Sequence, residues 1–233
     1  MHVRDQRVII TGATGGVGPV MVEAFLALGA AVIAVGRRRT ALSDLLARCE
    51  QHPNLSVAEC DLSDGDNVDR LIASVHADGP LDSIVHVAGG FAYGELHEVA
   101  QDAIPRMVTL NFITSAYLLR SALPRMRQQG RGSIVLFSSE RAMSPEAGFG
   151  IYGATKAAVQ YLAQTAAIEN ASSGVRINSI LPGTIDTPAN RAAMPDADPS
   201  LWVKPADLAS AATWLCSANG EAVNGASLRL PNR

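Results

Sequence analysis

The chain has 233 residues, of which 48% are hydrophobic and 18% charged, so it is long enough to bury one substantial core as a single domain. Its net charge of −3 gives no electrostatic footprint for a nucleic acid, and no apolar run approaches the roughly 18 residues of a membrane span. Composition and charge therefore argue against nucleic-acid-binding and membrane-spanning proteins.

The N-terminus and the cysteines both indicate a cytoplasmic protein. Residues 1–7 lead directly into the first apolar run and contain no apolar core of a signal peptide. The three cysteines, Cys49, Cys60 and Cys216, are widely spaced and lack the pairing typical of metal sites. We therefore expect reduced thiols in the cytoplasm and no metal site.

Short β-branched runs alternate with longer helical patterns, which indicates a parallel sheet with helices on both faces. The expected strands lie near residues 7–11, 31–35, 55–60, 82–87, 133–137, 175–181 and 227–230. The expected helices lie near residues 17–28, 40–51, 65–77, 101–127, 150–171 and 205–217. No linker, repeat or low-complexity segment interrupts the pattern. The sequence thus predicts an α/β protein: one Rossmann-type domain over residues 1–233 with a doubly wound parallel sheet.

A glycine-rich turn follows the first expected strand. Residues 11–18 read Thr-Gly-Ala-Thr-Gly-Gly-Val-Gly, and Pro19 suits the first turn of the next helix, where an N–H needs no partner. Glycines let the backbone approach a pyrophosphate, and a helix N-terminus offers N–H groups and a favourable dipole to anionic oxygens. The strand–turn–helix–strand context favours a dinucleotide site over a plain tight connection. The residues expected at this site are Gly12, Thr14, Gly15, Gly16, Val17 and Gly18.

The end of the second expected strand indicates which nucleotide binds. An acidic residue there would bind a ribose diol and a basic one a 2′-phosphate, and residues 35–39 read Val-Gly-Arg-Arg-Arg. We therefore expect NADP(H) rather than NAD(H). Arg37 is the first candidate for the phosphate contact and Arg38 the second, because a guanidinium can donate in a fork to phosphate oxygens and stack on adenine. Arg39 is expected at a solvated helix start.

Three side chains in the second half of the chain could move a proton. Tyr152 and Lys156 are four residues apart in an Ala-rich segment that reads as one helix, so they share a face, and Ser139 lies thirteen residues before Tyr152. A phenol with a pKa of about 10 is a poor base at neutral pH, and an adjacent cation lowers that pKa. Such a tyrosine could exchange a proton with an alcohol or carbonyl oxygen. Taken alone, the pair also fits a helix face with a solvated lysine, and Ser139 fits a strand-end hydroxyl bonded to backbone.

Together these residues resemble the short-chain dehydrogenase/reductase family over nearly the whole chain. The family's glycine pattern and catalytic tetrad fall on Gly12, Gly16, Gly18, Asn111, Ser139, Tyr152 and Lys156. Its adenine contact, its coenzyme-side glycine and its nicotinamide loop fall on Asp61 and Leu62, on Ala88 and Gly89, and on Pro182, Gly183, Ile185 and Thr187. The resemblance implies an NAD(P)-dependent oxidoreductase that acts on alcohol or carbonyl groups.

The resemblance also implies a role for each member of the tetrad. Tyr152 would be the acid in reduction and the base in oxidation, and Ser139 would hold and polarise the substrate oxygen. Lys156 would lower the pKa of the phenol and hydrogen-bond the nicotinamide ribose. Asn111 would lie inside a long helix and hold a water near the lysine for proton relay. The alternative for Asn111 is a plain polar residue at a helix crossing.

The segments that follow the expected strands should meet at one edge of the sheet, because ligands of such sheets bind beyond the carboxyl ends of the strands. The sequence departs from the family before Ala88, where Val87 replaces an asparagine, so its hydrogen bonds between strands must be made otherwise or not at all. The preceding His86 is expected to be a packed strand residue. Residues 187–202 should form a short, polar substrate lid.

The substrate pocket is expected to contain Phe91, Met194 and Trp202, with core packing as the alternative for the last two. These side chains suggest a flat or apolar substrate. Residues 87–91 and 186–198 are also similar to dihydropteridine reductase, a divergent branch of the family. Ser139 and the arginines after the second strand, however, fit an ordinary NADP-dependent carbonyl reductase better.

Two classes of function stay open on the sequence. The first is an NADP(H)-dependent oxidoreductase acting on a small carbonyl or alcohol, such as a ketone, quinone or pterin. The second is a binding module that senses a nucleotide without turnover, which the fold alone does not exclude. Ser139, Tyr152 and Lys156 favour the enzyme, because a sensor needs no proton donor. The family usually forms dimers or tetramers through two long helices, here near residues 101–127 and 150–171, so a homo-oligomer is expected.

Overall fold

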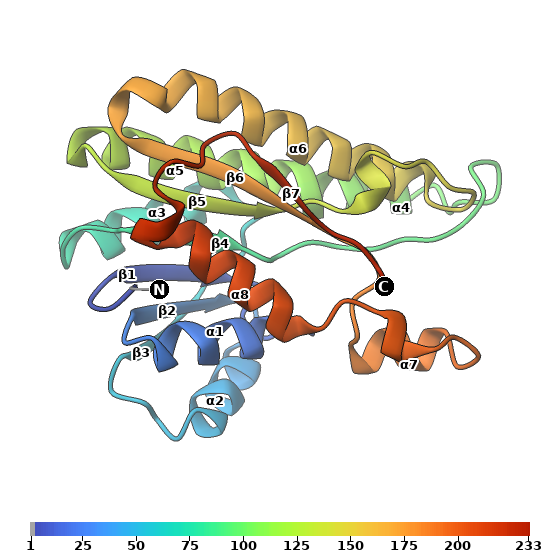
Figure 1. The fold of residues 1–233 in the computed structure, drawn as a ribbon, viewed down its shortest axis with the longest axis horizontal. Coiled ribbons are helices and arrows are strands. Elements are labelled where there is room, and N and C mark those ends of the chain that lie inside the picture. The colour runs from blue at the N-terminus through green and yellow to red at the C-terminus, as the bar shows by residue number, and fades with distance from the viewer. Residues whose placement is uncertain (1–2) are drawn as a thin grey trace.

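The computed structural model describes residues 3–233 and confirms the expected architecture, a seven-stranded parallel sheet with helices on both faces (Figure 1). The strand order is β3-β2-β1-β4-β5-β6-β7. From β1 the chain builds the sheet outward to β3, and then returns to the other side of β1 to add β4 to β7. The strand order therefore reverses between β1 and β4, which is the point where ligands bind in sheets of this kind.

All seven strands lie at or within a residue or two of their expected positions. They are β1 (Arg7–Thr11), β2 (Ala31–Gly36), β3 (Leu55–Glu59), β4 (Ser83–His86), β5 (Gly132–Phe137), β6 (Val175–Pro182) and β7 (Ser227–Leu230). The α-helices are α1 (Gly18–Ala27), α2 (Arg39–Arg48), α3 (Gly65–Ala77), α4 (Ala103–Met107), α5 (Thr114–Gln129), α6 (Gly150–Asn170), α7 (Pro188–Ala193) and α8 (Pro205–Cys216).

Two helical features were not expected from the sequence. The expected helix over residues 101–127 is three segments in succession, because a π-helical turn, Val108–Ile113, joins α4 to α5. The short helix α7 lies in the expected lid segment, and its N-cap is Thr187, whose hydroxyl accepts a hydrogen bond from the N–H of Asn190 (3.2 Å). Both features lie near the carboxyl ends of the strands.

The sheet separates two apolar cores. On one face α1, α2 and α8 pack on the sheet, and on the other α3, α5 and α6 do (Figure 1). The side chains of β1 alternate between the two cores: Val8 and Ile10 point to the first and Ile9 to the second. All three are fully buried, which explains why the strand reads as a continuous apolar run. Among residues 3–233, no helix has both the length and the apolar character needed to cross a membrane.

Candidate active site

The glycine turn holds the ends of β1 and β4 against each other. Gly12 has a φ of +65°, and a Cβ there would lie 2.7 Å from the backbone nitrogen of Ala88. Only glycine fits this close approach without strain. A Cβ on Gly16 would lie 3.0 Å from Cγ2 of Thr187, so the same turn also contacts the loop after β6. Three segments expected at the cofactor are therefore neighbours.

The N-terminus of α1 follows directly after this turn. Val17 is the N-cap residue and its side chain makes no capping hydrogen bond, while Pro19 lies in the first turn as expected. The N–H groups of the first turn therefore lack a side-chain cap. A backbone cradle that a Cβ would fill, followed by such a helix start, fits an anionic pyrophosphate.

Lys156 lies at the centre of the site. Its side chain is buried, and Nζ donates a hydrogen bond to the carbonyl of Phe137 at the end of β5 (2.8 Å). A Cβ on Gly89 would lie 3.1 Å from this Nζ and 2.8 Å from Oδ1 of Asn111. Lys156, Asn111 and Gly89 thus come together from three different elements, as their expected roles require.

Burial is the main cause of the pKa shifts of Tyr152 and Lys156. Burial raises the pKa of Tyr152, and the opposing effects come from a hydrogen bond with Ser139 and from the charge of Arg141. Lys156 is not among the causes of this shift, and its expected lowering of the pKa of Tyr152 stays a prediction. The ammonium lies 5.9 Å from the centroid of the phenol ring and is directed to Phe137. Burial also lowers the pKa of Lys156 to about 8.

Ser139 lies where β5 gives way to the turn Glu140–Ala142, and it is 6% exposed. Its hydroxyl oxygen accepts a hydrogen bond from the N–H of Arg141 (3.2 Å). Ser139 is therefore a hydroxyl at the end of a strand that bonds to the backbone, as the alternative interpretation expects. The same hydroxyl also hydrogen-bonds Tyr152, which leaves Ser139 and the phenol side by side.

Asn111 occupies the π-helical turn and is 1% exposed. Its Oδ1 accepts from the N–H of Gly90 (2.9 Å), and its Nδ2 donates to Oγ1 of Thr155 on α6 (3.0 Å). These bonds fasten the loop after β4 to α6. They match the alternative of a polar residue at a helix crossing, and a part in proton relay stays a prediction.

In the family, an asparagine at the position of Val87 makes hydrogen bonds between strands. Here the neighbouring His86 makes contacts of this kind. It is fully buried, and Nδ1 hydrogen-bonds Oγ1 of Thr11 on β1 (2.8 Å) while Nε2 faces Oγ1 of Thr114 (3.4 Å). The Thr114 hydroxyl donates to the carbonyl of Leu110 (2.9 Å) and therefore accepts from Nε2–H, which leaves Nδ1 to accept from the Thr11 hydroxyl. His86 is therefore a packed strand residue, as expected.

Replacing His86 with asparagine should flatten the pH dependence of stability. Burial and the charge of Lys156 lower the pKa of His86 to about 3. Between about pH 6.5 and pH 3, therefore, His86 is protonated in the unfolded chain and neutral in the native state. Stability therefore falls as pH falls through this window. Urea unfolding of the wild-type chain should lose about 1 kcal/mol more than His86→Asn between about pH 7.5 and 5.5. Equal losses in both proteins would contradict a neutral buried imidazole.

The expected adenine side lies beyond β2 and β3. Arg37 and Arg38 are exposed after the end of β2, and Leu62 is buried. Asp61 accepts hydrogen bonds from the N–H (3.0 Å) and hydroxyl (2.7 Å) of Ser63, which lower the pKa of the carboxyl, and the charge of Arg37 lowers it further. Arg37 and Asp61 are therefore close enough to interact.

The loop after β6 is well ordered by internal contacts. Ile185 forms a bridge with Val203, and Asp186 accepts two hydrogen bonds from Arg191 on α7 (2.6 and 2.8 Å). Pro182 is the last residue of β6, and Gly183 packs against the backbone of the chain end at Asn232. These contacts position Thr187 against the glycine turn.

The three expected pocket residues differ in exposure. Phe91 is 56% exposed and Met194 38%, whereas Trp202 is 5% exposed, as its core-packing alternative predicts. The ring of Phe91 meets the ring of Tyr152 edge-on, with centroids 5.0 Å apart. Arg141, whose charge acts on Tyr152, and Phe149, whose ring contacts Arg141 and Phe91, were not candidates from the sequence, because their positions depend on the fold of the loop after β5.

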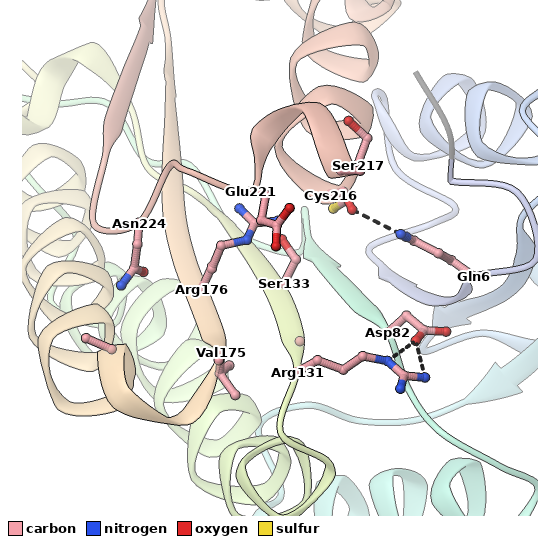
Figure 2. A pocket seen from close by; sticks show the side chains of 14 residues that line it. Gln6, Asp82, Arg131, Ser133, Val175, Arg176, Cys216, Ser217, Glu221 and Asn224 are labelled. Atoms are coloured by element: carbon pink, nitrogen blue, oxygen red, sulfur yellow. Dashed lines mark hydrogen bonds and ion pairs between the residues drawn. The ribbon is translucent and has the colours of Figure 1, made fainter.

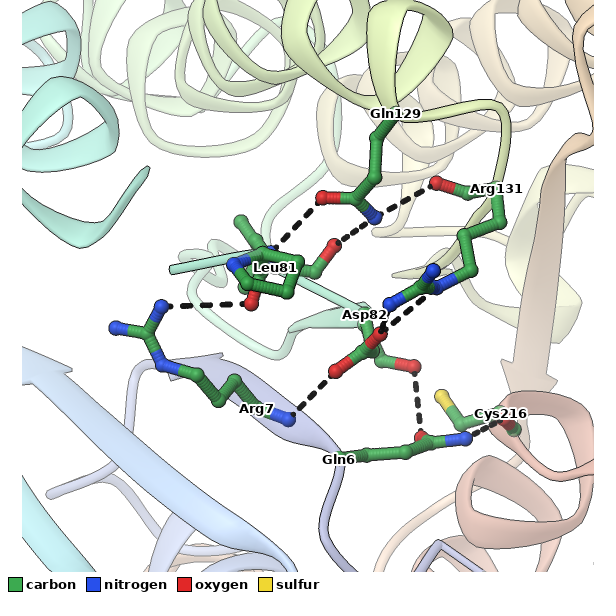
Figure 3. A network of polar contacts seen from close by, with 9 residues as sticks. Gln6, Arg7, Leu81, Asp82, Gln129, Arg131 and Cys216 are labelled. Carbon is green, nitrogen blue, oxygen red and sulfur yellow. Dashed lines mark hydrogen bonds and ion pairs between the residues drawn. The ribbon is translucent and has the colours of Figure 1, made fainter. Parts of the chain in front are cut away.

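One cavity lies away from these residues, at the amino ends of β4, β5 and β6 (Figure 2). Its volume is about 550 Å³. The polar groups around it bind the protein itself: Arg131 donates to Asp82 (3.2 Å), and Arg176 donates to three backbone carbonyls. The neighbouring network continues through Gln6 and Gln129 (Figure 3). We interpret this edge as structural, because Asp82, Arg131 and Arg176 already bind other groups of the protein.

Comparisons with known proteins show which family the chain resembles. The sequence profile of the family described as short chain dehydrogenase matches residues 6–198. The chain is 28% identical over 231 residues to dehydrogenase/reductase SDR family member 4 of Homo sapiens, covering 93% of this chain and 83% of that protein. A short-chain type dehydrogenase/reductase from Mycobacterium ulcerans has a similar structure, with a TM-score of 0.93, 32% identity, and coverage of 99% and 90%. So does a gluconate 5-dehydrogenase from Burkholderia cenocepacia in complex with NADP and tartrate, with a TM-score of 0.92, 25% identity, and coverage of 99% and 95%.

Proposed function

The chain belongs to the short-chain dehydrogenase family and is an oxidoreductase of CH–OH or C=O groups, and from this premise we propose that it transfers hydride between NADP(H) and a small carbonyl or alcohol compound. The observation that carries the proposal is the meeting of Ser139, Tyr152 and Lys156 beside Gly89 at the carboxyl ends of β4 and β5. A ketone, quinone or pterin-like substrate would suit such a site.

Each polar group has a part in the proposed reaction. When bound, the nicotinamide cofactor supplies or accepts the hydride. Tyr152 gives its proton to the carbonyl oxygen in reduction and takes it back in oxidation. Ser139 donates to the same oxygen and orients it, because its hydroxyl lies beside the phenol. Lys156 binds the ribose on the cofactor side, and its buried position beside Gly89 supports this role.

The cofactor would lie along the edge where the strands end. The backbone of residues 12–18 and the N-terminus of α1 would hold the pyrophosphate, and Asp61 and Leu62 would contact the adenine. Ala88, Pro182, Ile185 and Thr187 would border the nicotinamide. We propose Arg37, assisted by Arg38, as the partner of a 2′-phosphate, which makes NADP(H) the preferred cofactor. The NADP complex of the Burkholderia cenocepacia relative supports this choice.

Further expectations remain proposals. We place Phe91 and Met194 on the substrate side, supported by their exposure, and residues 187–202 as the lid. We also propose a homodimer or homotetramer that assembles through α5 and α6. Free thiols at Cys49, Cys60 and Cys216 support a reducing compartment such as the cytoplasm.

Titration of the purified protein with NADPH and NADH, followed by nicotinamide absorbance with a panel of ketones, quinones and quinonoid dihydropterin, tests the proposal. We expect NADPH to bind more tightly than NADH and at least one carbonyl compound to be reduced. Nucleotide binding with no turnover across the panel would favour the sensor, and tighter binding of NADH would overturn the assignment of the arginines.

A further inference from the structure

Aromatic rings form a continuous cluster that starts at the catalytic phenol. Phe91 meets Tyr152 edge-on at 5.0 Å between centroids, Phe149 meets Phe91 at 6.0 Å, and Tyr93 meets Phe149 edge-on at 5.2 Å. Edge-to-face and tilted pairs at these distances are favourable. We call Phe91, Tyr93 and Phe149 the ring cluster. Phe91 is 56% and Tyr93 68% exposed, so the cluster reaches from the reacting hydroxyl to the surface.

The ring cluster is built from two loops that are held together. Phe91 and Tyr93 follow β4, whereas Phe149 ends the loop after β5 and is the N-cap residue of α6. The N–H of Gly94 donates to the carbonyl of Gly148 across the two loops (2.9 Å). Gly148 has a φ of +81°, and a Cβ there would overlap the ring of Tyr93, so the ring lies directly on its backbone. The rings are therefore preorganised.

Charges beside the ring cluster are already compensated. The guanidinium of Arg141 lies over the ring of Phe149, 4.8 Å from its centroid, and forms an ion pair with Glu146. The ammonium of Lys156 is buried and donates to Phe137. An anionic substituent would have to displace Glu146 from Arg141. The surroundings of Tyr152 therefore favour an uncharged substrate.

Other exposed apolar side chains lie in the loops at this edge of the sheet. Beyond the ring cluster, Leu96 (71%), Met143 (52%) and Met194 (38%) are exposed in the loops that follow β4, β5 and β6. Exposed apolar side chains in the loops beside a polar reacting group are typical of a ligand site. A substrate that presents its oxygen to Tyr152 and Ser139 would lie with its neighbouring group against Phe91.

We propose that the ring cluster recognises an aromatic ring attached to the reacting carbonyl, so that the substrates are uncharged aryl ketones or aldehydes and the corresponding aryl carbinols. This inference rests on the proposed function for its chemistry. In reduction the C=O π bond is lost, the carbonyl carbon gains a C–H bond with the hydride of NADPH, which is oxidised to NADP⁺, and the oxygen gains an O–H bond with the proton of Tyr152. The phenol then recovers a proton from solvent.

Acetophenone and cyclohexyl methyl ketone test the inference, because they differ only in the ring. Conjugation makes the aryl ketone the poorer hydride acceptor, so a preference for it reports recognition of the ring. With NADPH, kcat/KM should be at least about tenfold higher for acetophenone, since two ring contacts of this kind together give about a tenfold preference. Phe149→Leu and Phe91→Leu should each reduce the preference to less than about threefold. Tyr161→Leu, which removes an exposed ring on α6 outside the cluster, should retain it.

A binding experiment separates this inference from the proposed function. Binding of the two ketones to the NADP⁺ complex of Tyr152→Phe is measured by saturation-transfer NMR, because this variant keeps the ring of residue 152 and cannot donate the proton. If acetophenone binds selectively and Phe149→Leu abolishes this selectivity, the inference is supported even when no ketone is reduced. Absence of reduction would then count only against the proposed function. Reduction of both ketones without preference would overturn the inference and leave the proposed function intact. Failure of this complex to bind acetophenone selectively would also overturn the inference.

Discussion

Replacement of Tyr152 by phenylalanine should lower kcat by about 10²- to 10⁴-fold, the usual contribution of a positioned general acid. The phenol is the group that hydrogen-bonds Ser139, and its ring packs edge-on against Phe91, so removal of the oxygen alone leaves the packing of the ring in place. The affinity for NADPH should change less than about twofold, because the variant removes no contact expected for the pyrophosphate or the 2′-phosphate. Steady-state kinetics and a fluorescence titration with NADPH measure the two quantities.

Tyr161→Phe provides the control, because it makes the same change at an exposed position on the same helix. Its kcat should equal that of the unchanged chain. A Tyr152→Phe variant that keeps more than about a tenth of kcat would show that another group supplies the proton.

The pH dependence of the two directions should differ for the same reason. Burial raises the pKa of Tyr152, so the phenol holds its proton at neutral pH and is ready to act as an acid. Reduction should stay constant through neutral pH and fall only as the pH rises through this pKa, whereas oxidation, which needs the phenolate, should rise over the same interval.

The positions of the site residues could be predicted because each follows a strand or shares a helix face. Parallel strands end at one edge, so Gly12, Gly89, Ser139 and Thr187 had to become neighbours once the strands were identified. Two close approaches agree with this for the glycine turn: Gly12 contacts the backbone of Ala88, and Gly16 contacts the side chain of Thr187. The glycines are recognisable in the sequence because no other residue allows these approaches.

Contacts that depend on several elements at once could not be predicted from the sequence. The spacing of Tyr152 and Lys156 indicates proximity, but the direction of the ammonium is set by the Phe137 carbonyl at the end of β5. The π-helical turn at Val108–Ile113 has no local pattern that separates it from an α-helix, yet it positions Asn111 between Gly90 and Thr155. The ring cluster joins two loops, and loop geometry is the least regular part of a fold.

Reversal of the charge at Arg37 should change cofactor preference more than any other single substitution outside the catalytic residues. In Arg37→Glu the guanidinium that would bind a 2′-phosphate is replaced by a carboxylate, which repels the phosphate and accepts from a ribose diol. A charged hydrogen bond contributes about 1.5–3 kcal/mol, so the Kd for NADPH should rise about 10- to 100-fold while the Kd for NADH changes little or falls. Isothermal titration with both nucleotides gives the ratio directly.

The adjacent arginines provide matched controls for this prediction. Arg39→Glu makes the same charge change two residues later, at the first residue of α2, and should weaken NADPH binding less than about threefold because it alters only the surrounding field. Asp61 lies close enough to Arg37 for the two charges to interact, so Arg37→Glu also places two carboxylates near each other, which adds to the repulsion of the phosphate. Equal losses in Arg37→Glu and Arg39→Glu would mean that net charge, and not a specific contact, selects the nucleotide. A loss confined to Arg38→Glu would transfer the phosphate contact to Arg38.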